Sequence, residues 1–262
     1  KYFSYLKKRY MWGTNLYYYL SAKHKIHPTY IQYMLSDKRY EDNEIILAIE
    51  NLKKQKCRTY NPIILKNSKQ FFKNSYSENV NLDLFRNRKI LIIANGNTLS
   101  DNKKKIEKFI KKNNPLIISL NNVQSYKISK KIDYLAICHP TRIISEIKSI
   151  PKNMKLITPY SSLKDNLQKI LKDYRKINYG LIVDEKNFKI LENYCVLDKA
   201  LVLPYVLSML TVSNIRSIYF AGLDGYENNI EMRKESNKIL NKFKKLNSNK
   251  TFKFLTPTKY KI

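Results

Sequence analysis

The sequence predicts an α/β protein in which a doubly wound, mostly parallel sheet follows a small all-α subdomain. Three observations lead to this fold class. The run Ile90–Ala94 is apolar throughout and ends at the turn Asn95-Gly96-Asn97, as strands buried on both faces do in parallel sheets. From residue 89 onward strand-like and helix-like segments alternate, and residues 1–75 show helical periodicity without strand alternation.

Strands are expected throughout the second part of the chain, with helices between several of them. The expected strands are Lys89–Ala94, Leu116–Leu120, Asp133–Cys138, Met154–Thr158, Tyr179–Val183, Ser217–Ala221 and Phe252–Thr256. The expected helices are Asn102–Lys112, Thr141–Ser149, Ser161–Lys172, Lys199–Ser213 and Glu231–Leu246. Such alternation is typical of one parallel sheet that is covered by helices on both faces.

The first part of the chain reads as short helices that pack on something else. One of them carries Ile45, Ile49 and Leu52 on a single face, and Pro28 suits the first turn of another. The polar stretch 73–88 then marks a boundary. We therefore expect a helical subdomain at 1–75 and an α/β domain at 76–262.

Composition sets limits on the class of protein. An apolar fraction of 43% in 262 residues suffices for a core, and no run of about 18 apolar residues predicts a membrane span. The three cysteines are far apart and form no Cys-x-x-Cys or Cys/His cluster, which predicts reduced thiols of a cytoplasmic protein without a metal site. The chain begins at Lys1 rather than Met, which suggests a fragment of a longer polypeptide.

The net charge of +29 raises the question of a nucleic-acid partner. The excess is nearly all Lys, spread evenly and mixed with Asn, Ile and Tyr, without an Arg-rich stripe. This distribution favours solvated helix faces, so no nucleic acid is expected. A field of this sign would still attract a small anionic ligand.

Polar residues and glycines follow directly on several of the expected strands. Because ligands of open α/β sheets bind at the carboxyl ends of the strands, these turns predict a binding site. The residues expected to contact a nucleotide are Asn95, Gly96, Asn97, Thr98, Asn121, Gly222 and Asp224. The first loop has a single Gly and no following Gly-Lys-Ser/Thr, so it matches neither common phosphate-loop pattern.

For each candidate residue, a role in ligand binding or catalysis and a purely structural role both stay open. The helix after the first strand would direct its free N–H groups at a phosphate. Asp224 would hold a ribose hydroxyl or a metal, or would cap its own turn. Two residues are candidate catalytic groups: His139 as a general base or as a turn histidine, and Tyr226 as a donor to a phosphate or as a packed surface side chain.

Residues 1–72 resemble the helical tail behind the barrel of 4-hydroxy-2-oxovalerate aldolases and pyruvate carboxyltransferases. The matching residues are Tyr10-Met11-Trp12-Gly13, Tyr18-Tyr19-Leu20-Ser21-Ala22, His27-Pro28-Thr29-Tyr30 and Leu35, with Leu255-Thr256-Pro257-Thr258-Lys259-Tyr260 at the far end. In that family the barrel carries the divalent metal and the catalytic residues. The resemblance therefore implies a missing N-terminal barrel as partner and no metal in this chain.

Residues 89–245 resemble the Rossmann-like core of a bacterial sialyltransferase family that uses a CMP-activated sugar. The matching residues are Ala94-Asn95-Gly96-Asn97-Thr98-Leu99, Leu120-Asn121 and Ile218–Tyr226. The resemblance implies that Asn95, Gly96, Thr98 and Asn121 meet the nucleotide and that Tyr226 meets the phosphate. Val202-Leu203 stands where that family has Ser-Gly, and residues 227–246 lack its catalytic His.

Together these observations predict the C-terminal part of a bacterial, cytoplasmic aldolase-type protein. Its Rossmann-like domain would bind a nucleotide or nucleotide-sugar as its ligand, without a complete catalytic set of its own. One alternative is a sialyltransferase-like glycosyltransferase with a CMP-sugar donor, in surface polysaccharide biosynthesis. Another is a non-catalytic interaction or scaffold module, and a homo-oligomer is left open.

Overall fold

The computed structural model describes residues 72–73, 75–121, 131–139, 142–143, 147, 150–226 and 230–261. Nearly all of the expected helical subdomain, including the aldolase-like motifs of residues 1–72, lies outside these ranges. Most of the helix expected at 141–149 lies outside them too. No helix among the described residues is long and apolar enough to cross a membrane.

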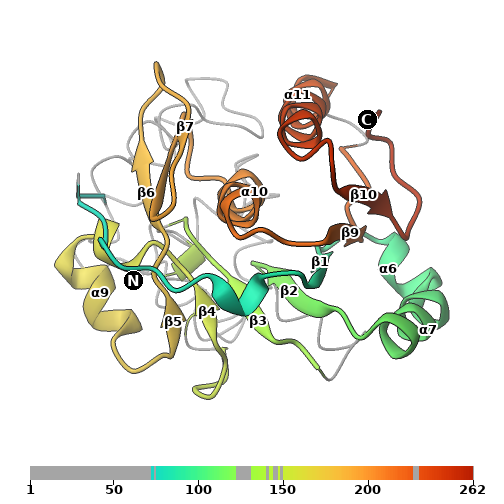
Figure 1. Ribbon diagram of the computed structural model, residues 1–262, viewed down its shortest axis with the longest axis horizontal. Helices are drawn as coiled ribbons and strands as arrows, with labels where there is room; N and C mark the ends of the chain where they lie inside the picture. Colours follow the sequence, from blue (N-terminus) through green and yellow to red (C-terminus); the bar gives the residue numbers. More distant parts are fainter. Residues whose placement is uncertain are drawn as a thin grey trace, which may run out of the picture.

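The main sheet has seven strands, all parallel to their neighbours (Figure 1). They are β1 (Lys89–Ile93), β2 (Leu116–Leu120), β3 (Tyr134–Ala136), β4 (Leu156–Ile157), β5 (Lys176–Ile177), β9 (Ser217–Ala221) and β10 (Thr251–Phe254). Their order across the sheet is β10-β9-β1-β2-β3-β4-β5. The predicted Rossmann-like parallel sheet is confirmed.

Helices cover both faces of this sheet. The helices are α6 (Thr98–Asp101), α7 (Lys103–Asn113), α9 (Asp165–Leu171), α10 (Val202–Val212) and α11 (Ile230–Leu246), with 3-10 turns η2 (Asp83–Phe85) and η5 (Tyr160–Ser162). Ile106 of α7 packs in a cluster with Leu91 and Ile93, on one face of β1. Leu207 of α10 and Leu240 of α11 belong to the larger cluster on the opposite face. The sheet is therefore doubly wound.

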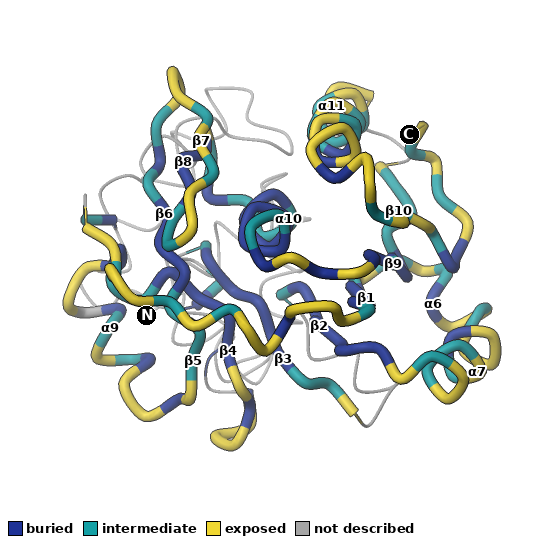
Figure 2. The backbone as a smooth tube through the Cα atoms, viewed as in Figure 1, coloured by how far each residue is buried: buried dark blue, intermediate teal, exposed yellow. Residues whose placement is uncertain are grey.

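Strand β1 is the centre of this arrangement. Its residues Ile90–Ile93 are each at most 1% exposed, because both faces of the strand are covered (Figure 2). All five residues of β2 are buried as well. Burying one such aliphatic side chain contributes about 1.5–3 kcal/mol, so a continuous apolar run is what this position in a parallel sheet requires.

One expected strand belongs to a different sheet. Tyr179–Val183 was predicted as part of the main sheet, but β6 (Gly180–Val183) pairs with β8 (Tyr194–Leu197), which pairs in turn with β7 (Lys189–Ile190). The Tyr179 hydroxyl donates to the carbonyls of Leu191 and Tyr194 at 2.8 and 3.0 Å, which links the residue before β6 to β8 and to the turn that precedes β8. The edge of the main sheet is taken by β5 instead.

The polar stretch before β1 is part of the α/β body. Phe85 in η2 is fully buried, and its ring centroid lies 5.7 Å from that of Tyr134 in β3. The ring of Tyr76 stacks on that of Tyr194 at 3.9 Å. These contacts place residues 76–88 against both sheets. The boundary expected near residue 75 stays a prediction.

Candidate functional site

The strands that follow β1 in sequence, β2 to β5, lie on one side of it in the sheet, and β9 and β10 lie on the other side. After β1 the chain passes through α7 on one face to reach β2, and after β9 it passes through α11 on the other face to reach β10. The two connections diverge at the carboxyl ends of β1 and β9, so the loops after these strands form the switch point of the sheet. In open α/β sheets this switch point is the usual position of the ligand.

The loops after these two strands continue side by side beyond the sheet. Ala94 N–H donates to the Ala221 carbonyl at 2.9 Å, and Gly96 N–H donates to the Gly222 carbonyl at 2.7 Å. Gly222 has φ +68°, and a Cβ there would lie 2.7 Å from the Ala94 carbonyl oxygen and 2.5 Å from Leu99 Cγ. This close approach requires glycine at position 222.

The side chain of Asp224 lies over the first loop. Its Oδ2 accepts a hydrogen bond from Thr98 N–H at 2.9 Å, and its Oδ1 accepts one from the Thr98 hydroxyl. A Cβ on Gly96 would lie 2.3 Å from Asp224 Cγ, so only glycine leaves room for the carboxylate. The sequence predicts that the amides of this loop bind a phosphate. In the structure those of Gly96 and Thr98 already have partners in the second loop.

The other residues of the first loop are open to solvent. Asn95 and Asn97 are exposed, and Asn97 precedes α6 without a side-chain capping bond. The carbonyl of Asn97 accepts a hydrogen bond from the Ser100 hydroxyl at 2.9 Å. The side chains of Asn95 and Asn97 are therefore accessible to a ligand at the switch point.

Asn121 follows β2, the neighbour of β1. It adopts a left-handed conformation with φ 48°, and its N–H donates to the Ala136 carbonyl at 3.0 Å. Its Oδ1 is buried and has no hydrogen-bond partner within the part of the chain that the structure describes. A buried acceptor without a partner costs about 1–3 kcal/mol, so this oxygen would gain from a donor on a ligand.

His139 and Tyr226 lie at the same edge of the sheet but on strands that are not neighbours. His139 follows β3 and Tyr226 follows β9, with β1 and β2 between them. The ends of these two strands are three strand spacings, about 14 Å, apart. The catalytic roles of His139 and Tyr226 stay predictions. Burial and the Arg142 guanidinium lower the pKa of His139 to about 4, which leaves its imidazole neutral at pH 7.

The C-terminal segment, which the sequence does not predict as part of the site, holds the second loop in place. Gly222 N–H donates to Thr256 Oγ1 at 2.9 Å, and the Thr258 hydroxyl donates to the Leu223 carbonyl at 2.7 Å. Lys259 N–H donates to the Asp224 carbonyl at 2.7 Å. Burial, and to a smaller extent the charge of Asp224, raise the pKa of Tyr260. Residues 256–259 thus fix the backbone of the loop that follows β9.

In the described part of the chain, no three His, Cys, Asp or Glu side chains come together where they could hold a metal ion. Cys138 and Cys195 are both buried and free. Burial raises the pKa of both thiols, which makes them poor nucleophiles.

Comparisons with known proteins show a distant likeness in structure. No protein-family model and no curated protein matches this chain. The fold is similar to that of the MAf glycosyltransferase from Magnetospirillum magneticum AMB-1, with a TM-score of 0.33 and 11% identity, over 74% of this chain and 33% of that chain. Nothing in these comparisons supports the aldolase hypothesis.

Proposed function

We propose that the loops after β1 and β9 bind a nucleotide or a nucleotide-sugar. The observation that carries this proposal is the Asp224 carboxylate at the switch point, oriented by its two hydrogen bonds with Thr98. A carboxylate offers about four acceptor positions, and Thr98 uses two of them. The remaining positions suit the paired hydroxyls of a ribose, which an acidic residue after a different strand binds in dinucleotide folds.

The surroundings of Asp224 fit the other parts of such a ligand. The buried Oδ1 of Asn121 would accept from an amino group of the base or from a sugar hydroxyl. The net charge of +29 attracts the phosphate groups. The phosphates would lie away from the amide of Thr98, because Asp224 is already bound there and would repel them.

Binding is tested by thermal unfolding and calorimetry with CMP, UDP, CMP-sugars and UDP-sugars. A ligand at a hundred times its dissociation constant stabilises the fold by about 2.7 kcal/mol. Asp224→Asn keeps the shape but removes the charge, and we expect it to weaken binding by about tenfold or more. Asp173→Asn is the matched control, because Asp173 is 72% exposed and lies after α9, far along the sheet. Absence of a shift with every nucleotide would overturn the proposal.

Glycosyl transfer is the second candidate, because His139 follows β3 at the edge of the sheet where the loops of Gly96 and Asp224 also lie. The imidazole would take the proton of an acceptor hydroxyl, whose oxygen bonds to the anomeric carbon as the bond from that carbon to the phosphate oxygen breaks. A nucleotide held at Asp224 would have to extend its sugar toward β3. We expect His139→Asn to abolish release of CMP from a CMP-sugar in the presence of acceptor, with nucleotide binding unchanged. Equal release by both proteins would reject this role for His139.

A further inference from the structure

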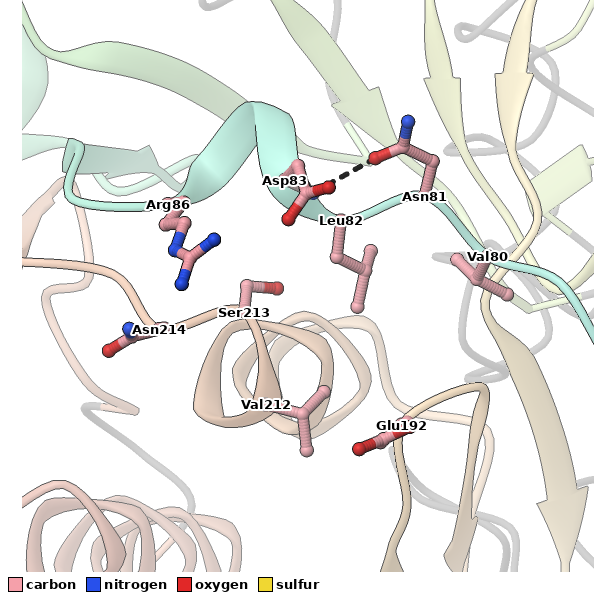
Figure 3. Close-up of a pocket in the computed structure, with 9 residues that line it drawn as sticks. All are labelled: Val80, Asn81, Leu82, Asp83, Arg86, Glu192, Val212, Ser213 and Asn214. Carbon is pink, nitrogen blue, oxygen red and sulfur yellow. Dashed lines mark hydrogen bonds between the residues drawn. The ribbon is translucent and has the colours of Figure 1, made fainter.

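A cavity of about 360 Å³ has no lining residue in the loops that follow β1 and β9. It is bounded by the segment before β1, the end of α10 and the turn before β8 (Figure 3). Its lining residues are Val80, Asn81, Leu82, Asp83, Arg86, Glu192, Val212, Ser213 and Asn214. The volume falls within the range of small-molecule sites. Nothing in the proposed function uses it.

The backbone around this cavity is fixed by hydrogen bonds. Asn87 N–H donates to the Asn214 carbonyl at 3.0 Å, and Arg216 N–H donates to the Arg88 carbonyl at 2.9 Å. Asp83 N–H donates to Asn81 Oδ1 at 3.0 Å. These bonds join the segment before β1 to the end of α10, so the cavity has a preformed shape.

Opposite charges stand at the two sides of the cavity. Figure 3 shows Arg86 beside Ser213 and Asn214 on one side, with the carboxylate of Asp83 on the same segment, and Glu192 on the other side, with Leu82 and Val212 between them. Within the described residues, neither Arg86 nor Glu192 forms a side-chain hydrogen bond or an ion pair. Both charges are therefore available to a ligand.

We propose that this cavity binds a small aliphatic zwitterion whose carboxylate and ammonium groups are separated by a methylene chain. The guanidinium of Arg86 would hold the carboxylate through paired N–H donors, and Glu192 would accept from the ammonium. Leu82 and Val212 offer an apolar surface to the methylene groups. A diamino acid such as lysine has this chemistry.

The test is calorimetry on the whole chain with 6-aminohexanoate and L-lysine, compared with hexanoate and hexylamine. We expect the zwitterions to bind about tenfold more tightly than the two single-charge compounds, because these leave one charged side chain of the cavity without a partner. Equal affinity for 6-aminohexanoate and hexanoate, or no binding of either zwitterion, would overturn the proposal.

Two variants test which side chain binds each charged group of the ligand. Arg86→Gln should weaken the binding of 6-aminohexanoate by about tenfold and leave the affinity for hexylamine unchanged. Glu192→Gln should weaken the binding of 6-aminohexanoate and leave the affinity for hexanoate unchanged. The controls are Arg88→Gln and Glu185→Gln, which alter exposed residues of the same types outside the cavity lining. A control that weakens binding as much as its partner variant would show a general charge effect and refute the site. The nucleotide affinity of Arg86→Gln should be unchanged, so the two sites are tested separately.

Discussion

Replacing Gly96 by alanine should break the contact between the loop after β1 and the loop after β9. The new Cβ would lie 2.3 Å from Cγ and Oδ1 of Asp224, far inside van der Waals contact. The carboxylate has to move away, and both of its hydrogen bonds with Thr98 are lost. Hydrogen bonds to a charged group contribute about 1.5–3 kcal/mol each, and the site is half-buried, so we expect a loss of about 2–4 kcal/mol.

The cause is isolated by a double-mutant cycle measured by urea unfolding followed by circular dichroism. Asp224→Ala removes the clashing carboxylate and costs about as much by itself, because the same two bonds disappear. In that background Gly96→Ala should cost less than about 1 kcal/mol, which gives a coupling of about 2 kcal/mol. An equal cost of Gly96→Ala in both backgrounds would refute the contact between Gly96 and Asp224.

Three further predictions concern residues around the site. The pKa of His139 is about 4 in the fold and 6.5 for an unperturbed histidine, so the unfolded chain binds the extra proton between these values. Stability should fall by up to about 3 kcal/mol from pH 6.5 to pH 4, and His139→Asn should remove that part of the slope in urea titrations at each pH. Cys138 and Cys195 should resist alkylation at pH 8 until denaturant is added, as peptide mass mapping would detect; rapid labelling of the native protein would contradict their burial. The buried Tyr205 hydroxyl donates to the Tyr179 carbonyl at 2.6 Å, so Tyr205→Phe should lower the free energy of unfolding by about 1–2 kcal/mol; an unchanged urea midpoint would reject this contribution.

The centre of the fold could be predicted from the sequence because its signals are local. The strands at Leu116–Leu120 and Ser217–Ala221 have the bounds that the apolar runs and their flanking turns predict. The strand at Lys89 ends one residue earlier than expected, at Ile93. A strand buried on both faces has an uninterrupted apolar sequence, and this pattern needs no knowledge of its partners.

The pairing of strands depends on contacts that no local pattern contains. The run 179–183 has the same sequence pattern whether it joins the main sheet or the small one. In the structure the hydroxyl of Tyr179 donates to the carbonyls of Leu191 and Tyr194, which belong to the small sheet and its turn. Strand β5 has only two half-buried residues, Lys176 and Ile177, too few for any periodicity. Both errors come from information that is distant along the chain.

The sequence predicted which loops lie together at the switch point and not the contacts between them. Turns after strands led to the loops of Gly96 and Gly222 and to Asp224, which lie together in the structure. The sequence could not tell that Asp224 accepts from Thr98, because the choice between capping a turn and contacting another loop is made by the fold. The sequence does not single out residues 256–259 as contacts of this loop, since Thr and Lys occur throughout this chain.

The position of β1 also affects how the chain is made. Its neighbour β2 follows within 30 residues, but β9 on its other side begins only at Ser217, and Thr98 and Asp224 are 126 residues apart. At 5–20 residues per second a ribosome needs on the order of 10 s for that distance. During this time the newly made β1 has one edge without a strand partner, and its side chains are the most apolar of the sheet. An unpaired apolar edge is prone to association with other chains, so this protein should depend on chaperones mainly in the interval before β9 emerges.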